Sequence, residues 1–219
     1  MRSLRFLPEV VWISGLMVTL GSDFGECPAD MVQVSDTVCI DRFEWPNRKG
    51  QRPLIAASAV AETEDLEAGL IMDGERLCKQ RNKRLCYVDE WVSACLGPED
   101  AKFPFGNTLP RYAPGDNSGL CNYDKRFRNV DEYKVFKRDR DELSRLNQSE
   151  PSGSRQSCVS SSGAYDMMGN VEEWVRTRSG SYALAGRFWA EPWSCYSLSY
   201  LHAPNWHYYQ SGFRCCLDI

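Results

Sequence analysis

The chain has 219 residues, enough for one domain with a sizeable core. Its 26 Lys and Arg are outnumbered by 30 Asp and Glu. The resulting net charge of −4 excludes a nucleic-acid backbone as the main partner, because phosphate neutralisation needs a basic face. Ten cysteines stand beside only two histidines, and neither the CxxC nor the HxxxH spacing occurs. This pattern disfavours zinc and predicts disulfides formed in an oxidising compartment.

Residues 1–26 are typical of a leader for export. Arg2 and Arg5 precede an apolar run over residues 10–20, which is the length that a signal peptide needs. The run is shorter than the roughly 20 apolar residues of a membrane-spanning helix. We therefore expect a mature domain over residues 27–219 with no membrane span, in a secreted or periplasmic location.

Short strands and two helices are expected next along the chain. Alternating apolar residues predict strands at residues 31–34 and 39–47, the second ended by Pro46. Residues 59–81 favour a helix with one apolar and one charged face, and a further helix is expected over 88–95.

The second half of the chain is richer in loops. Four prolines and several Gly and Asn residues predict a loop over residues 97–118. Residues 126–156 are interpreted as a divergent exposed insertion, with a helical pattern only at 135–146. Residues 180–219 are dense in aromatic side chains, which indicate either core packing or a groove for a ligand.

One run, from Gly163 to Trp174, has the spacing of a cation-binding loop. It places an Asp, a Gly, a Val and a Glu at offsets 0, 3, 5 and 7, on a turn that needs glycine. These residues are Asp166, Gly169, Val171 and Glu173. Two carboxylates and two backbone carbonyls form the all-oxygen shell that calcium prefers. The alternative is a turn before a strand, with Trp174 as a core anchor.

Four motifs in register resemble one known family. They are KRLCYVDEW at residues 83–91, FPFGN at 103–107, DMMGNVEEW at 166–174 and GFRC at 212–215. Together they resemble the signatures of the formylglycine-generating enzyme, or sulfatase-modifying factor, domain, over residues 27–219. The resemblance implies an α+β fold of the elaborated C-type-lectin-like kind, rich in loops.

The resemblance also implies two disulfides. Family cysteines that flank the first motif correspond to Cys78 and Cys95. The first is usually bonded to the cysteine of GFRC, which implies Cys78 with Cys215. The second is usually bonded beyond the catalytic segment, which implies Cys95 with Cys195. The other six cysteines have no family counterpart and are paired here as guesses: Cys27 with Cys39, Cys86 with Cys216, and Cys121 with Cys158.

The family's catalytic cysteines are absent. Its enzymes bind copper(I) through two thiolates, the soft ligands which that ion requires, in a Gly-Gly-Ser-Tyr-x-Cys-x4-Cys segment. The corresponding positions here are Leu184 and Trp189, and neither can bind copper. The resemblance therefore argues against conversion of a substrate cysteine to formylglycine.

Calcium is the one family cofactor whose ligands have counterparts in this sequence. By family position, Asp166 and Glu173 would provide side-chain oxygens, and Gly169 and Val171 would provide carbonyls. A second family calcium site corresponds to Asn122 and Tyr123, although its downstream aspartate has no counterpart in the divergent insertion.

Three functional hypotheses follow. The first is a non-catalytic, exported domain that binds a peptide, a protein or a small ligand. Its groove would be lined by four residues: Tyr182, Trp189, Trp193 and His202. The second is a divergent metal-dependent oxidase, either formylglycine-generating-like or with a non-haem iron held by His202, His207 and a carboxylate. The third is a structural protein of the cell envelope with no small ligand.

Overall fold

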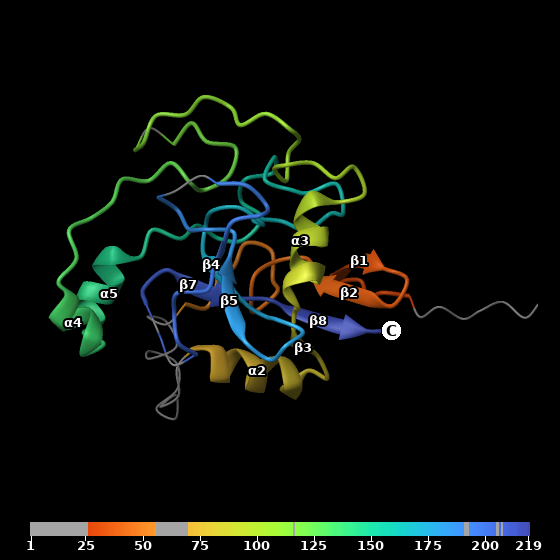
Figure 1. Ribbon diagram of the computed structural model, residues 1–219. Coiled ribbons are helices and arrows are strands. Elements are labelled where there is room, and N and C mark those ends of the chain that lie inside the picture. Colours follow the sequence, from red (N-terminus) through yellow and green to blue (C-terminus); the bar gives the residue numbers. More distant parts are fainter. Residues whose placement is uncertain (1–25, 56–69, 116, 191–192, 205, 207) are drawn as a thin grey trace, which may run out of the picture.

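Two four-stranded sheets, joined by short helices and long irregular connections, form the frame of the domain (Figure 1). The computed structural model describes residues 26–55, 70–115, 117–190, 193–204, 206 and 208–219. The strands are β1 (Met31–Ser35), β2 (Val38–Asp41), β3 (Arg84–Leu85), β4 (Glu172–Arg176), β5 (Tyr182–Ala185), β6 (Leu198–Ser199), β7 (Ser211–Phe213) and β8 (Cys215–Asp218). The helices are α2 (Leu70–Gln80), α3 (Val88–Leu96), α4 (Glu132–Phe136) and α5 (Arg140–Leu146).

The order of the strands brings two sequence motifs side by side. The first sheet has the order β1-β2-β8-β3 and is antiparallel throughout. The second has the order β6-β5-β4-β7, with β4 and β7 parallel, and Glu173 lies opposite Gly212. Only Arg214 separates β7 from β8, so this residue lies where the chain passes from one sheet to the other.

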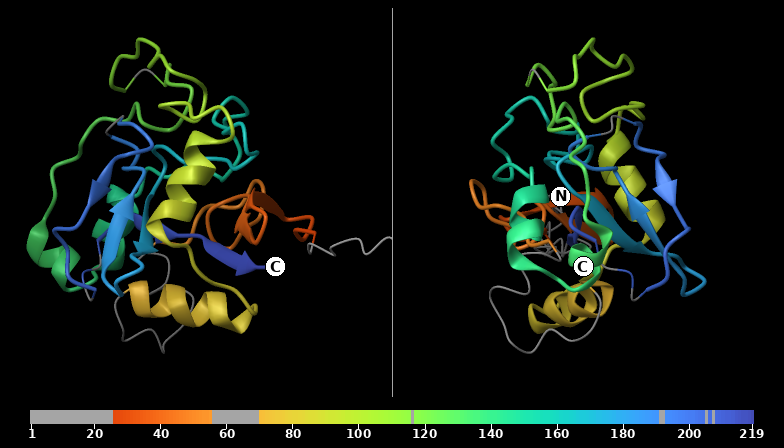
Figure 2. Two further views of the ribbon diagram at one scale, coloured as in Figure 1. Left: turned by 45° about the vertical axis from the view of Figure 1, so that its right-hand side comes forward. Right: turned by 90° about the vertical axis from the view of Figure 1, so that its left-hand side faces the viewer.

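Helix α3 lies between the two sheets and contacts strands of both (Figure 2). The Glu90 carboxylate accepts a hydrogen bond of 2.8 Å from the backbone N–H of Tyr87, which fixes the start of the helix. Gly97, at φ 63°, ends it, and a Cβ atom there would lie 2.0 Å from the Ser161 hydroxyl oxygen. The helix buries Trp91 completely. The prediction of a helix over 88–95 is therefore confirmed.

All ten cysteines are bonded in five disulfides, with the pairings given above. Two adjacent cysteines of β8 hold this strand in place, Cys215 bonded to Cys78 of α2 and Cys216 to Cys86 beyond β3. A third bridge joins Cys95 of α3 to Cys195. Each native bridge contributes roughly 2–4 kcal/mol by restricting the unfolded chain, a large share in a domain with so many loops.

Two predicted elements differ from the structure. The strand expected over residues 39–47 ends at Asp41, because the chain turns there and the Asn47 carboxamide oxygen accepts from the Phe43 N–H at 2.9 Å. In the helix expected over 59–81, α2 occupies the last part, and residues 56–69 lie outside the described residues, as does the leader up to residue 25.

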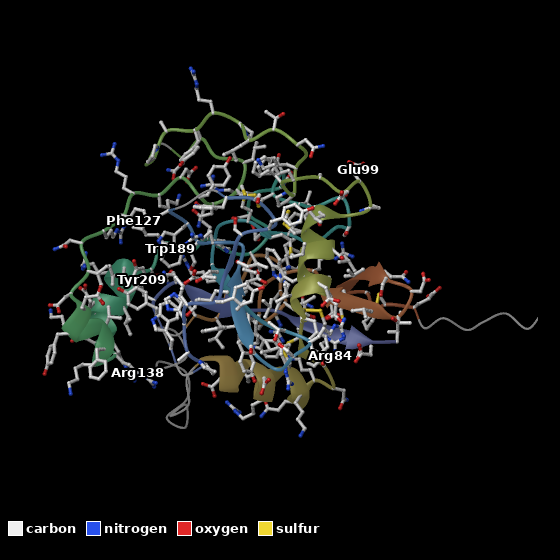
Figure 3. All side chains as sticks on the ribbon, in the orientation of Figure 1. Arg84, Glu99, Phe127, Arg138, Trp189 and Tyr209 are labelled. Atoms are coloured by element: carbon white, nitrogen blue, oxygen red, sulfur yellow. A yellow bond between two sulfur atoms is a disulfide. The ribbon has the colours of Figure 1, made fainter. Side chains whose placement is uncertain are left out.

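The segment 126–156 is not simply an exposed insertion, and this interpretation is corrected. Its two helices bury Val135, Leu143 and Leu146 in one hydrophobic cluster with Trp189 and Tyr209. Figure 3 labels these last two side chains on the side of the second sheet that faces α4 and α5. The sequence does not reveal that these helices pack against the core. With only one or two turns each, α4 and α5 are too short to show an apolar period.

No helix in the described part of the chain is both long and apolar enough to cross a membrane.

Candidate functional site

The loop from Asp166 to Glu173 packs against the segment predicted to hold a second ion. Gly169 has φ 77°, and a Cβ atom there would lie 2.4 Å from the Asn122 carbonyl oxygen, so only glycine fits. The backbone N–H of Asn170 donates to that carbonyl at 2.7 Å. The structure thus places both predicted calcium segments in direct contact.

A fully buried ion pair closes the end of this loop. The Glu173 carboxylate accepts from the Arg214 guanidinium at 2.6 Å and 2.5 Å, and from the Trp91 indole N–H at 2.8 Å. The guanidinium donates further to the carbonyl oxygens of Asp41 and Tyr165. Both Glu173 oxygens are therefore directed at Arg214, which the calcium hypothesis did not anticipate.

Two further carboxylates lie in the same buried region. One Asp166 oxygen accepts from the Gly153 N–H at 2.7 Å. One Glu44 oxygen accepts from the Ser152 hydroxyl at 2.6 Å and from the Asn170 amide at 2.7 Å. The other Glu44 oxygen, Oε1, is buried with no hydrogen-bond partner among the residues that the structure describes. An unsatisfied buried carboxylate oxygen is costly and signals a missing proton or cation.

The charges of this buried region do not balance. We call the region the buried acidic cluster and define it as Glu44, Asp166, Glu173 and Arg214. Three carboxylates and one guanidinium leave two negative charges in excess when all are ionised. Burial, reinforced by the charges of Asp166 and Glu173, raises the pKa of Glu44 well above its ordinary value. Burial raises the pKa of Asp166 to about 7, against hydrogen bonding and Arg214, which lower it.

This cluster fits a divalent cation in charge and in donor chemistry. Carboxylate and carbonyl oxygens are calcium ligands, and the excess of two negative charges equals the charge of the ion. The side-chain geometry is not that of a formed metal centre: no three His, Cys, Asp or Glu residues within the described ranges are grouped to hold a metal. Sequence reasoning missed Glu44 and Arg214 as members. The signal for Glu44 was a carboxylate between Phe43 and Trp45, in a stretch otherwise destined for the core.

The predicted second calcium site, at Asn122 and Tyr123, lies beside an arginine, and its Asn122 Oδ1 is buried with no hydrogen-bond partner among the residues that the structure describes. Tyr123 is buried, and the Asn122 amide donates to Gln148 and Asn170. Beside them the Arg155 guanidinium donates to several oxygens of neighbouring residues. It bonds the carboxylates of Asp124 and Glu150 and the carbonyls of Gly119 and Cys121.

The charge around Arg155 is balanced. The Lys125 ammonium contacts Glu150 at 2.6 Å and Asp124 at 3.6 Å, so two carboxylates meet two cations. Although desolvation opposes it, hydrogen bonding to Arg155 and Lys125 lowers the pKa of Glu150 to about 2. This Arg155 cluster (Asp124, Lys125, Glu150 and Arg155) supplies its own positive charge beside the predicted second calcium site.

Both positions of the lost catalytic thiolates lie inside the hydrophobic core. Leu184 of β5 is opposite Trp174 of β4 and is 2 % exposed. Trp189 is 1 % exposed and packs edge-on against Phe188. Apolar side chains thus stand at the two positions that the family resemblance assigns to copper ligands.

The four aromatic residues predicted to line one groove do not do so. Trp189 is a core residue, and the Tyr182 hydroxyl donates to Glu75 of α2 at 2.8 Å. Trp193 is half exposed beneath the Arg187 guanidinium, and the His202 ring stacks on Trp206. The dense aromatic segment 180–219 offered no periodicity that could separate core rings from surface rings. His202 lines a groove together with Trp206 and Tyr208.

The arrangement of sheets and loops defines the domain as a C-type-lectin-like fold. Its sequence matches the family described as the sulfatase-modifying factor enzyme 1-like domain over residues 71–219, and the chain belongs to that family. No curated protein sequence matches it.

Several solved structures are similar to this chain at low sequence identity. The Major Tropism Determinant P3c variant has a TM-score of 0.50 and 13% identity, covering 88% of this chain and 53% of that one. A structure of CarF has a TM-score of 0.48 and 16% identity, with 83% and 86% covered. Treponema denticola variable protein 1 has a TM-score of 0.41 and 22% identity, with 63% and 48% covered. The chain spans about half the length of the first and third of these proteins.

Proposed function

We propose that this domain is a non-catalytic member of the sulfatase-modifying factor family that works by binding, in a secreted or periplasmic location. The observation that carries the proposal is the pair of buried apolar side chains, Leu184 and Trp189, at the two copper-ligand positions. Without thiolates at these positions, copper(I) would not be bound, and the family's oxidation reaction requires that metal. Five disulfides support the oxidising location.

A structural calcium ion is the second part of the proposal. Its support is the charge excess of the buried acidic cluster and the unpaired oxygen of Glu44. Asp166, Glu44 and the carbonyls of Gly169 and Val171 would hold the ion. When bound, calcium would supply the positive charge that Arg214 alone does not provide. Glu173 would act beside it, by fixing Arg214.

The oxidase alternative has less support. His202 is the one histidine that can be placed, and its ring centroid lies 3.7 Å from that of Trp206, an arrangement of packing. His207 lies outside the described residues, so the two-histidine iron hypothesis stays a prediction.

An aldehyde assay tests the proposal. The purified protein, supplied with copper(I) and oxygen, is incubated with a sulfatase-type cysteine peptide, and aldehyde is measured by hydrazide capture and mass spectrometry. We expect no aldehyde above the protein-free control, while an authentic formylglycine-generating enzyme converts the same peptide. Catalytic conversion by this chain would overturn the proposal.

A further inference from the structure

Two tyrosine–glutamate pairs on the surface are alike in geometry and unlike in surroundings. The Tyr208 hydroxyl donates to Glu132 of α4 at 2.8 Å. The Tyr182 hydroxyl donates to Glu75 of α2, also at 2.8 Å. Each pair holds a carboxylate in a fixed position at the edge of a pocket, so the neighbours decide what each can bind.

The Glu75 carboxylate lies among cations. Its pocket, of about 310 Å³, is also lined by four basic residues, and Arg176 approaches Glu75 to 3.6 Å. The basic residues are Lys79, Lys83, Arg84 and Arg176. A further cation has little to gain there, because the local charge is already balanced or positive.

The Glu132 carboxylate lies among aromatic and aliphatic groups. We call this pocket, of about 440 Å³, the aromatic groove. It is lined by Glu132, Val135, Phe136, Leu201, His202, Ala203, Trp206 and Tyr208. Phe136 is 72 % exposed and Leu201 is 90 % exposed, which is unusual for side chains of their size.

The rings of the groove form an ordered platform. His202, Trp206 and Tyr208 are stacked in succession, with centroid separations of 3.7 Å and 5.2 Å and interplanar angles of 20°. Trp206 in turn meets the buried Trp174 edge-on at 6.3 Å, so the platform is anchored to the core. Ordered rings present their exposed electron-rich faces without a large entropic cost on binding.

Charge selects the kind of ligand. Glu132 is the one acidic or basic residue with a permanent charge among the described residues that line the groove. Burial lowers the pKa of His202, so this imidazole is neutral at pH 7. The Lys137 ammonium lies 5.8 Å from the Phe136 ring centroid, so Phe136 already faces a cation, and the stacked rings are the ones left for a ligand. Electron-rich rings beside a single carboxylate favour an organic cation, by cation–π attraction and by direct charge pairing.

We propose that the aromatic groove binds a small organic cation, a substituted ammonium group on an apolar body. This inference rests on the proposed binding role and names its ligand class. Rings contact the alkyl groups around the nitrogen, and Glu132 provides the counter-charge.

Choline and its uncharged isostere 3,3-dimethyl-1-butanol are the probes, with affinity measured by calorimetry and by ligand-observed NMR. We expect the isostere to bind about tenfold more weakly than choline, the ratio that cation–π and charge pairing give at a partly exposed site. Glu132→Gln keeps an acceptor for Tyr208, and we expect it to weaken choline binding to a similar degree. Glu75→Gln is the matched control, because it alters the other tyrosine–glutamate pair, and should leave choline binding unchanged.

Equal binding of the two probes, no binding of choline, or equal loss in both variants would overturn this inference. So would self-association through the groove that choline does not compete with, since that would identify a second copy of the chain as the occupant. Failure here is distinguishable from failure of the proposed function, because the aldehyde assay is independent of choline.

Discussion

The two buried arginine clusters use the same chemistry with opposite charge balance. Around Arg214, three carboxylates meet one cation, and a Glu44 oxygen has no described partner. Around Arg155, two carboxylates meet two cations, and two carbonyl oxygens complete the guanidinium's contacts. The charge balance is what distinguishes the cluster where we propose a calcium ion from the cluster that already holds two cations.

Removing Arg214 should have the largest effect. Arg214→Met leaves Glu173 buried without its partner, and loss of one member of a buried pair costs about 3–5 kcal/mol. Denaturant unfolding would measure the loss. The double variant Arg214→Met with Glu173→Leu should recover part of it, because Glu173 is then no longer a buried charge without its partner. A single variant as stable as the wild type would contradict the role given to this pair.

Metal-free protein should lose stability as the pH rises from about 4 to about 7. The pKa of Asp166 is raised from 3.8 to about 7 in the folded state, so the folded chain keeps a proton that the unfolded chain releases. Three pKa units correspond to at most about 4 kcal/mol. The loss would be measured as unfolding free energy across this pH range in the presence of chelator.

Calcium should oppose this loss, by about 2.7 kcal/mol when its concentration is 100 times its dissociation constant. Asp166→Asn is the control, because asparagine tolerates the φ of 55° at this position and cannot release the proton. A metal-free protein with flat stability between pH 4 and 7, and inert to calcium, would argue against the site.

Removing Arg155 should lower stability less than removing Arg214, and should make the stability more sensitive to calcium. Arg155→Met frees oxygens of Asp124, Glu150, Gly119 and Cys121, and should cost about 2 kcal/mol, since Lys125 still offsets part of the charge. Calcium should then stabilise this variant more than it stabilises the wild type, because an all-oxygen set has become available. Thermal unfolding with and without calcium would measure the difference.

Arg178→Met is the comparison variant for Arg155, because Arg178 is itself exposed and its pair with Asp89 is worth about 1 kcal/mol or less. Arg178 also contacts Glu90 at 3.1 Å, but Arg84 pairs with the same carboxylate and stays in place in the variant. An Arg155 variant that responds to calcium no more than this control would show that the cluster does not stand in for an ion.

The fold class could be predicted from the sequence because the four motifs form strands and loops that hold the two sheets together. GFRC provides β7, Arg214 and the start of β8, and the motif at 166–174 provides the loop and β4. The same motifs aligned the cysteines, so the bridges of Cys78 and Cys95 could be proposed before the structure.

The remaining features depend on contacts between distant residues. Glu44 and Arg214 meet only after the two sheets have formed, and no local spacing encodes their proximity. Trp189 and Trp206 belong to one aromatic segment, yet the first is core and the second lines a groove. Trp189 is buried because α4 and α5 pack against it. The sequence of two such short helices does not show which side of the sheet they cover.

The central position of β8 in the first sheet has a consequence for biosynthesis. Strands β2 and β3 pair with β8 on either side and not with each other. Until β8 has emerged from the ribosome, these earlier strands lack the neighbour that joins them. Cys78 and Cys86 must likewise await partners more than a hundred residues downstream. Folding of this domain is therefore completed only after β8 has been translated, an order of events that is compatible with the oxidising location proposed above.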